Sequence, residues 1–209
     1  VIIGAGAAGS AAAEMLRRQG CEGRVTMIDS DVDAPYDRPN LSKSYLAGSA
    51  PREFVPLRPD DFYQQHGIER IERPVAAIDP GQRQVRLGDG ETIAYDALLL
   101  ATGAEPRRLD IPGHDLPHVH VLRTLADCEA IIAGTEGAKR AVVIGASFIG
   151  LEVAASLRAR ELEVHVVAPS PPLVKVFGPE LGVMIQGLHE EQGVTFHLGQ
   201  TAARIEPDA

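Results

Sequence analysis

Apolar and polar positions follow one order at the start of the chain and repeat it past the middle. Residues 1–4 form an apolar run, which leads through glycines into an alanine-rich amphipathic stretch at 7–19 and then into a second apolar run at 24–29. An apolar strand, a glycine turn, an amphipathic helix and another apolar strand are typical of a strand–helix–strand unit in a parallel sheet. We therefore expect the chain to begin with such a unit.

The second copy lies in the C-terminal half. It has an apolar run at 142–145, an amphipathic stretch at 148–160 and a further apolar run at 163–168. After it, the pattern predicts a helix over 179–192 and a strand over 194–198. Two strand–helix–strand units in one chain favour the α/β fold class.

The chain between the two units has a different texture. Residues 30–58 are rich in Pro, Asp, Ser and Arg, which predicts a long loop, and residues 58–65 could form a short helix. Short apolar runs within 68–100, separated by turn signals, predict an antiparallel β meander attached to the first unit. A capping box at 124–127 predicts the start of another helix.

A Pro- and Arg-rich stretch at 106–112 marks the expected boundary between two domains. We expect a first domain at 1–107 and a second at 108–209.

The composition is that of an ordinary globular protein, with 209 residues of which 44% are hydrophobic and 23% charged. No apolar run approaches the ~18–20 residues of a membrane span, so none is expected. The net charge of −9 argues against non-specific binding to nucleic acid, which needs a basic surface. Cys21 and Cys128 stand in no metal or redox spacing, which favours a reducing, cytoplasmic setting.

The first glycine turn has the spacing of a dinucleotide-binding site. Gly4 permits a tight turn, Gly6 lets the backbone approach a pyrophosphate, and Gly9 lets the helix pack on the strand. The helix start at Ala7 and Ala8 supplies amides and the positive end of the helix dipole. Asp29 ends the next strand, where a carboxylate can accept a hydrogen bond from a ribose. These residues predict a Rossmann-like nucleotide site.

The second turn is looser. Gly145 and Gly150 keep their places, but Ser147 replaces the middle glycine, and Ala168 replaces the acid expected at the end of the following strand. A serine still permits fairly close approach of the backbone and can donate its hydroxyl to a phosphate. The missing acid removes the usual signal for NADH, and no arginine stands there to bind a 2′-phosphate. The residues alone leave the choice of coenzyme open.

Two further segments carry a resemblance to a known family. Pro35-Tyr-Asp-Arg-Pro-Asn-Leu-Ser-Lys-Ser-Tyr-Leu46 and Leu98-Leu-Leu-Ala-Thr-Gly-Ala-Glu-Pro-Arg107, together with the two glycine turns, are similar to the FAD-dependent pyridine-nucleotide oxidoreductases. The branch is that of putidaredoxin, rubredoxin and dioxygenase ferredoxin reductases, with apoptosis-inducing-factor-like proteins. The resemblance implies that the first unit binds FAD and the second binds NAD(P)H, with NADH slightly favoured.

The resemblance also assigns individual residues. It implies that Lys43 lies beside the flavin ring and that Glu152 is its ion-pair partner, so these two residues are the catalytic candidates. A cation there stabilises negative charge on the reduced flavin, and the carboxylate keeps the lysine charged. The full set of cofactor-binding candidates is Gly4, Gly6, Ala7, Ala8, Gly9, Asp29, Arg38, Lys43, Val75, Ala101, Thr102, Gly103, Arg123, Gly145, Ser147, Ile149, Gly150 and Glu152.

The function that the resemblance implies is enzymatic: NAD(P)H reduces FAD by hydride transfer, and single electrons pass to an iron–sulfur protein of the ferredoxin or Rieske type. Relatives that reduce disulfides carry a Cys-x₄-Cys pair after the first unit, and NADH oxidases carry one cysteine there. Residues 38–43 of this chain read Arg-Pro-Asn-Leu-Ser-Lys, without a thiol. Two alternatives stay open, a reductase of small molecules such as quinones or monodehydroascorbate, and a non-catalytic redox-sensing flavoprotein that resembles apoptosis-inducing factor.

The family also has a segment that returns to the FAD domain and a C-terminal interface domain. Neither follows the second unit here. We therefore expect the chain to be the N-terminal part of a longer protein, with both domains incomplete.

Overall fold

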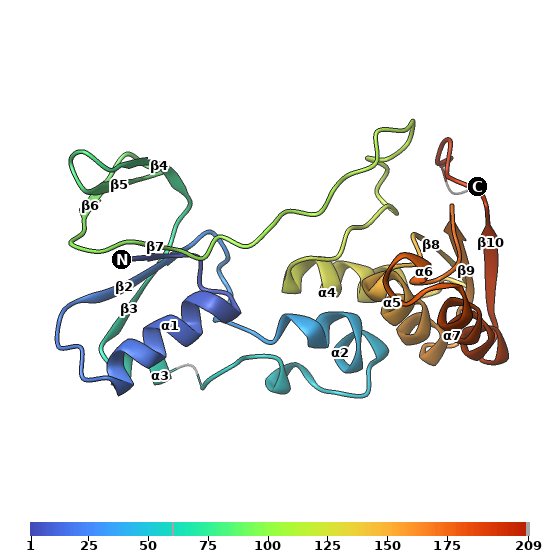
Figure 1. Cartoon of the computed structure of the whole chain (residues 1–209), viewed down its shortest axis with the longest axis horizontal. Coiled ribbons are helices and arrows are strands. Elements are labelled where there is room, and N and C mark those ends of the chain that lie inside the picture. Colours follow the sequence, from blue (N-terminus) through green and yellow to red (C-terminus); the bar gives the residue numbers. More distant parts are fainter. Residues whose placement is uncertain (60, 208–209) are drawn as a thin grey trace. The chain divides into compact units, whose positions relative to one another are not determined.

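The structure is a computed structural model that describes residues 1–59 and 61–207. The chain divides into two compact units, one made of Val1–Arg38 with Glu53–Glu105 and the other of Pro39–Arg52 with Pro106–Ala209. Figure 1 labels most of their helices and strands. Within the described ranges, no helix is both long and apolar enough to cross a membrane.

The first unit is built on a four-stranded sheet in the order β3-β2-β1-β7. Its strands are β1 (Ile2–Ile3), β2 (Val25–Asp29), β3 (Ile68–Glu72) and β7 (Leu99–Leu100), and the neighbours are all parallel. The prediction of one meander across 68–100 was therefore wrong at both ends, because β3 and β7 extend the parallel sheet. Alternating apolar residues predict a strand but do not tell a parallel partner from an antiparallel one.

The antiparallel meander is confirmed in the middle of that region. It consists of β4 (Val75–Asp79), β5 (Gln84–Leu87) and β6 (Thr92–Ala94), in the order β4-β5-β6. Val85 and Leu87 on β5 are fully buried and belong to the same apolar cluster as Ile3 and Ile28 of the parallel sheet. The meander therefore covers one face of the sheet.

Helix α1 (Ala7–Arg18) packs against the first unit through a separate apolar cluster, which joins Ala13 to Ile2 and Met27. The expected helix at 7–19 is thus confirmed, with Gln19 as its C-cap. Since α1 and the meander belong to different clusters, both sides of the central strands are buried, as is usual for a parallel sheet.

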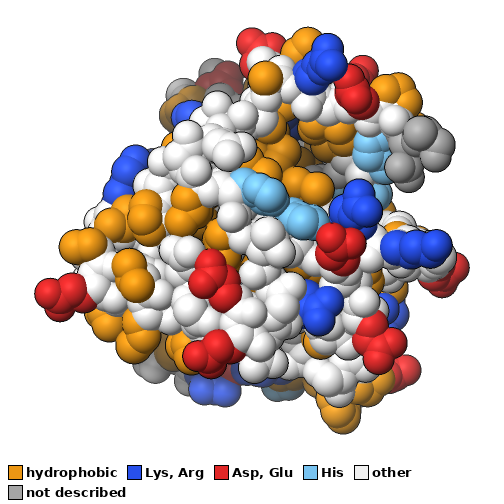
Figure 2. Space-filling view, turned by 90° about the vertical axis from the view of Figure 1, so that its right-hand side faces the viewer, with side chains coloured by type: hydrophobic (Ala, Val, Ile, Leu, Met, Phe, Trp, Pro, Cys, Tyr) orange, Lys and Arg blue, Asp and Glu red, His pale blue; other side chains and the backbone are white. Residues whose placement is uncertain are grey.

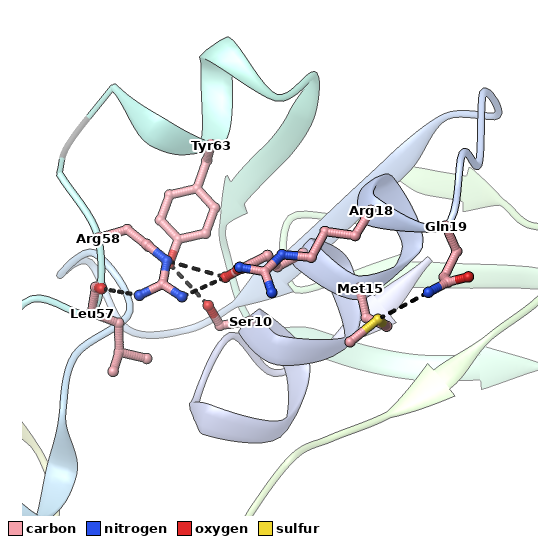
Figure 3. A network of polar contacts seen from close by, with 8 residues as sticks. Ser10, Met15, Arg18, Gln19, Leu57, Arg58 and Tyr63 are labelled. Atoms are coloured by element: carbon pink, nitrogen blue, oxygen red, sulfur yellow. Dashed lines mark hydrogen bonds and ion pairs between the residues drawn. The ribbon is translucent and has the colours of Figure 1, made fainter.

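A polar network ties α1 to the segment before and within the short helix α3 (Phe62–Gln65) (Figure 3). The Arg58 guanidinium donates to Glu14 Oε2 at 2.7 and 3.1 Å and to the Leu57 carbonyl at 2.8 Å. The hydroxyls of Ser10 and Tyr63 lie 3.0 Å apart. The short helix expected at 58–65 is therefore present but shorter, and Asp60 lies outside the described residues.

The second unit holds a three-stranded parallel sheet in the order β10-β9-β8. It is formed by β8 (Arg140–Ile144), β9 (Glu163–Ala168) and β10 (Val194–Leu198), with helix α5 (Phe148–Ala159) between the first two and α7 (Pro179–Glu191) before the last. All five elements confirm the sequence pattern. Val164 and Val166 on β9 are fully buried against Ala154 and Leu157 of α5.

Helix α4 (Leu125–Gly134) begins at the expected capping box. Thr124 Oγ1 accepts the Asp127 N–H at 3.1 Å, and Asp127 Oδ2 accepts the Thr124 N–H at 2.8 Å. A short helix that was not expected, α6 (Val174–Phe177), precedes α7.

Figure 2 shows the side of the molecule on which β10 lies in Figure 1. On this face, apolar side chains gather beside adjacent histidines.

The loop predicted over 30–58 contains three short helical segments, so that prediction was wrong in its middle. They are η1 (Arg38–Ser42), α2 (Ser44–Ala47) and η2 (Arg52–Phe54), where η marks a 3₁₀ helix. Gly48 ends α2 with a positive φ of 79°. Helices of three to five residues leave no amphipathic period to detect, because one turn alone takes about 3.6 residues.

Candidate functional site

The glycine turn of the first unit needs its first and third glycines for steric reasons. Gly4 has φ +98°, and a Cβ built on it would lie 2.2 Å from the Ala101 carbonyl oxygen. A Cβ on Gly9 would lie 1.9 Å from the Gly4 carbonyl oxygen. The Gly4 N–H donates to the Ile28 carbonyl at 2.7 Å, which fixes the turn to β2. No larger residue fits at either position.

The middle glycine leaves open space of the kind that a phosphate can occupy. A Cβ on Gly6 would meet only Arg38 Nη2, at 3.8 Å. Gly6 is the N-cap of α1 without a side-chain cap bond, and Ala7 and Ala8 of the first helical turn are exposed. The Arg38 guanidinium, which also lies 5.2 Å from the ring centroid of Tyr36, therefore stands near uncapped helix amides. Amides and a guanidinium together suit a pyrophosphate.

Asp29 is held in place by the backbone. Its Oδ2 accepts the Ala5 N–H at 2.5 Å, and its Oδ1 accepts the Asp31 N–H at 3.0 Å. A carboxylate has about four acceptor sites, so each oxygen keeps one for a ribose hydroxyl. The structure thus gives Asp29 a fixed orientation beside the glycine turn.

The remaining candidates of the first unit lie at strand ends. Ala101 follows β7, donates its N–H to the Ile3 carbonyl at 2.8 Å and touches the glycine turn through its own carbonyl. Thr102 and Gly103 continue from it and are exposed, with φ +73° at Gly103. Val75 begins β4 and packs its side chain on the apolar cluster of the meander. The structure therefore brings Gly4, Asp29, Arg38 and Ala101–Gly103 around one turn, with Val75 placed on the meander.

The second unit repeats the turn. Gly145 has φ +113° and donates its N–H to the Val167 carbonyl at 2.8 Å, and a Cβ on Gly150 would lie 2.2 Å from the Gly145 carbonyl oxygen. Ser147 is the N-cap of α5 and makes no side-chain cap bond, and Ile149 in the first helical turn is exposed. The turn thus repeats the contact between its third and first glycines and the bond to the next strand, with an exposed hydroxyl at its middle position. It differs at the first glycine, because a Cβ on Gly145 would meet nothing within 4 Å.

Lys43 and Glu152 form an ion pair within the second unit. Lys43 Nζ lies 3.0 Å from Glu152 Oε1, with the lysine side chain half exposed and the glutamate side chain 29% exposed. The Ser42 hydroxyl donates to the other carboxylate oxygen, Oε2, at 2.6 Å. Both oxygens of Glu152 are therefore engaged, and the pair predicted from the resemblance is present.

Arg123 lies immediately before α4. Its backbone N–H donates to Asp127 Oδ2 at 2.9 Å, which extends the capping box by one residue. The structure thus places Arg123 in the second unit, at the start of a capped helix.

Three residues that the sequence analysis did not single out take part in this part of the site. Ser42 bonds to Glu152, Ser156 donates to the Ser42 carbonyl at 2.7 Å, and the Cys128 thiol donates to the Leu41 carbonyl at 3.2 Å. One signal could have found Ser156, which lies four residues after Glu152 and so on the same helix face. Nothing in the sequence pointed to Cys128.

An apolar groove lies along α5 beside Glu152. It encloses about 250 Å³, and its walls come from α5, α7 and the residue before α6. The ring of Phe148 at its edge meets Phe177 in a T-shaped contact with centroids 5.7 Å apart. The lining residues are Phe148, Leu151, Glu152, Ala155, Leu173, Ile185 and His189. The groove and the Lys43–Glu152 pair therefore share Glu152.

Each unit carries features that suit a dinucleotide. Each unit offers a glycine turn with space or a hydroxyl at its middle position, followed by an uncapped helix start. In the part of the chain that the structure describes, no three His, Cys, Asp or Glu side chains gather in a way that could hold a metal ion.

Comparison with known proteins gives the same picture. The model of the family described as "Pyridine nucleotide-disulphide oxidoreductase" matches residues 1–209. The chain is 42% identical over 200 residues to rhodocoxin reductase of Rhodococcus erythropolis, which covers 95% of this chain and 47% of that protein. It is 40% identical over 208 residues to the ferredoxin–NAD(+) reductase component of the biphenyl dioxygenase system of Paraburkholderia xenovorans, which covers 98% and 50%.

Solved structures agree at the level of the fold. The ferredoxin reductase for the CYP199A2 system of Rhodopseudomonas palustris superposes with a TM-score of 0.94 at 40% identity, over 99% of this chain and 52% of that one. The reductase in the covalent putidaredoxin reductase–putidaredoxin complex gives a TM-score of 0.92 at 35% identity, over 99% and 51%. The chain spans about half the length of the relatives that it matches. It belongs to the pyridine nucleotide-disulphide oxidoreductase family.

Proposed function

We propose that this chain is the nucleotide-binding part of an FAD-dependent NAD(P)H reductase that delivers electrons to an iron–sulfur protein. The first unit binds FAD and the second binds NAD(P)H. The observation that carries this proposal is the duplicated turn. In each unit the third glycine, Gly9 or Gly150, packs on the carbonyl of the first, and the first glycine, Gly4 or Gly145, donates its N–H to the following strand. A protein with two such turns is suited to hold two dinucleotides.

In the first unit, each candidate residue has one task. The amides of Gly6, Ala7 and Ala8 and the Arg38 guanidinium bind the pyrophosphate, and Asp29 accepts a hydrogen bond from the ribose. The backbone at Val75 faces the adenine, and the backbone of Ala101, Thr102 and Gly103 approaches the cofactor where β7 ends. Arg123 contributes a further contact to FAD.

In the second unit, the turn from Gly145 to Gly150 binds the pyrophosphate of NAD(P)H, with Ser147 donating its hydroxyl. Ile149 gives the cofactor an apolar contact from the first turn of α5. NADH is the expected coenzyme, because relatives such as the biphenyl dioxygenase component are ferredoxin–NAD(+) reductases by name.

When bound, FAD supplies the redox chemistry, by accepting a hydride from NAD(P)H and giving up electrons one at a time. The task of the protein is placement and electrostatics. Lys43 puts a positive charge beside the ring system and thereby stabilises its reduced, negatively charged form. Glu152 holds that ammonium in place at 3.0 Å.

The cysteines support an external iron–sulfur acceptor over disulfide chemistry. Cys128 is fully buried, and this burial raises the pKa of its thiol to about 11, so it stays protonated and unreactive at neutral pH. Cys21 is exposed and follows α1, far along the chain from Lys43. Without a reactive thiol pair, the electrons leave for a separate protein. A reducing, cytoplasmic setting fits the two cysteines, which form no disulfide with each other.

The experiment is an anaerobic visible spectrum of the complete protein, taken before and after addition of NADH and then NADPH. We expect a flavin band that bleaches quickly with NADH, and turnover that requires an added iron–sulfur protein. Fast turnover of quinones without that protein would favour a small-molecule reductase. Slow bleaching with a long-lived reduced complex would favour a redox sensor, and a colourless complete protein would refute FAD binding.

A further inference from the structure

Segment 39–52 is held to the rest of the second unit through its backbone carbonyls. The Cys128 thiol on α4 donates to the Leu41 carbonyl, and the Arg160 guanidinium after α5 donates to the Leu46 carbonyl. Between these two contacts, the Ser156 hydroxyl on α5 reaches the carbonyls of Ser42 at 2.7 Å and Lys43 at 3.2 Å. Of these contacts to backbone carbonyls, that of Ser156 is the nearest to the lysine.

Ser156 and Glu152 hold the same residue at its two ends. They stand four residues apart on α5, one helical turn, so their side chains leave the same face. Glu152 binds the ammonium of Lys43, and Ser156 binds the carbonyls that flank the Lys43 Cα. Lys43 is the N-cap of α2 and has a non-helical backbone, with φ and ψ both at −117°. The position of the Lys43 Cα, from which the side chain extends, thus depends on contacts from outside α2.

A lysine side chain has enough rotamer freedom to leave its partner when its Cα moves, and the Lys43 side chain is half exposed. The ammonium stays at Glu152 only if the backbone of residues 42 and 43 is fixed. Ser156 is 5% exposed, so its bond to the Ser42 carbonyl is shielded from bulk water.

We propose that Ser156 is a positioning residue that sets the place of the Lys43 ammonium, and through it the reduction potential of the bound flavin. This inference rests on the proposed function, because the charge of Lys43 matters only if FAD lies beside it. Ser156 acts through the backbone of Ser42 and Lys43.

The test is the midpoint potential of the flavin in the complete holoenzyme, for Ser156→Ala, Lys43→Met and the double variant. Lys43→Met removes the cation and is expected to make the potential more negative. Ser156→Ala should shift it in the same direction by less, and slow flavin reduction by NADH about fivefold, the loss of one hydrogen bond. In the double variant, Ser156→Ala should add nothing to Lys43→Met, because it acts through that lysine.

The matched control is Ser49→Ala, which also removes a bond from a hydroxyl to a carbonyl within segment 39–52, here the Ser44 carbonyl at 3.2 Å, but on the exposed side. Its potential should equal that of the wild type. Ser156→Cys, which keeps a weaker donor of similar size, should shift the potential less than Ser156→Ala and serves if the alanine variant does not fold.

Two results would overturn different claims. If Lys43→Met leaves the potential unchanged, the proposed role of Lys43 in a flavin site is wrong. If Lys43→Met shifts the potential while Ser156→Ala and Ser156→Cys do not, or if the shifts simply add, only the positioning role is wrong. A readout without cofactor complements these: in the apoprotein, amide hydrogen exchange at Ala47, whose N–H donates to the Lys43 carbonyl, should quicken in Ser156→Ala and not in Ser49→Ala.

Discussion

At the scale of single residues, Cys128 shows how burial decides chemistry. Its thiol has no exposed surface, and burial raises its pKa from 9.0 to about 11, with smaller effects from the nearby charges. The neutral thiol is the form that can donate to the Leu41 carbonyl, at 3.2 Å. The same environment that removes its reactivity therefore makes it a hydrogen-bond donor that anchors segment 39–52.

This shift predicts a loss of stability in alkaline solution. The thiol of the unfolded chain ionises near pH 9 and that of the folded chain near pH 11, so its contribution is complete below pH 9 and is lost as the pH rises through 11. The loss amounts to at most about 3 kcal/mol of the free energy of unfolding, since each pKa unit corresponds to about 1.4 kcal/mol. Cys128→Ser keeps a donor but does not titrate there, so urea unfolding from pH 8 to 11 should show a flatter profile for this variant. Parallel profiles for the two proteins would refute the prediction.

Whether a residue of the candidate site could be predicted from the sequence also depends on the kind of residue. Gly4, Gly9 and Asp29 were predictable, because a turn of this type permits few alternatives at fixed spacing. Lys43 and Glu152 came only from the resemblance, since nothing local pairs residues 109 positions apart. Ser156 was missed because its four-residue spacing from Glu152 becomes informative only once segment 39–52 is packed against α5.

At the scale of elements, α1 and α5 each carry an arginine in their last turn that hydrogen-bonds to the neighbouring loops. Arg17 on α1 donates to the carbonyls of Cys21, Gly23, His66 and Gly67 at 2.6–2.9 Å. Arg158 stands at the equivalent position of α5 and donates to the carbonyls of Gln192 and Leu162. In both units the arginine thus joins the loop after its helix to the residues that lead into the third strand, β3 or β10.

We expect Arg17→Met to lower the free energy of unfolding by about 1–3 kcal/mol, because the four carbonyls lose their charged donor while a methionine preserves much of the apolar stem. Arg18→Met is the matched control. Arg18 is the next residue of the same helix, 65% exposed and paired with Glu14 at the surface, so its replacement should change stability by no more than about 0.5 kcal/mol. Urea unfolding of the two variants side by side measures the difference, and equal losses would contradict the role of Arg17.

The elements themselves followed from the sequence where they are long and periodic. α1, α5, α7, β9 and β10 lie within a residue or two of their predicted bounds, because an amphipathic helix or an alternating strand repeats its signal several times. β3 and β7 were assigned to the wrong partners, since pairing is decided by crossover connections and not by the strand. The short helices η1, α2 and η2 were missed, because their stability comes from contacts to other segments.

At the scale of the whole molecule, the duplicated turn predicts that the two nucleotide sites can be disabled one at a time. Gly9→Ala forces a Cβ to within 1.9 Å of the Gly4 carbonyl and should yield protein without flavin colour, with a loss of about 1–3 kcal/mol in stability. Gly150→Ala makes the same clash in the second unit, at 2.2 Å from the Gly145 carbonyl. It should keep the colour and weaken NADH binding by about tenfold or more.

Gly187→Ala is the control for both variants, since Gly187 also lies within a helix, α7, and an added Cβ there meets nothing within 4 Å. It should retain flavin and NADH binding and gain up to about 1 kcal/mol in stability from helix propensity. Flavin absorbance at purification and NADH titration measure the two sites separately. Loss of both flavin binding and NADH binding in each of Gly9→Ala and Gly150→Ala would show that the two sites are not independent.

The grouping of segment 39–52 with the C-terminal residues has a consequence for how genes of this family can recombine. From the order of residues alone, a crossover between residues 105 and 106 would be expected to preserve both units, since it separates most of one unit from the other. It would nevertheless combine Lys43 from one parent protein with Glu152, Ser156 and Cys128 from the other. The ion pair and the hydrogen bonds that hold segment 39–52 would then be formed by residues from two different proteins. Viable chimeras should therefore exchange residues 39–52 together with the C-terminal part, as a two-piece cassette.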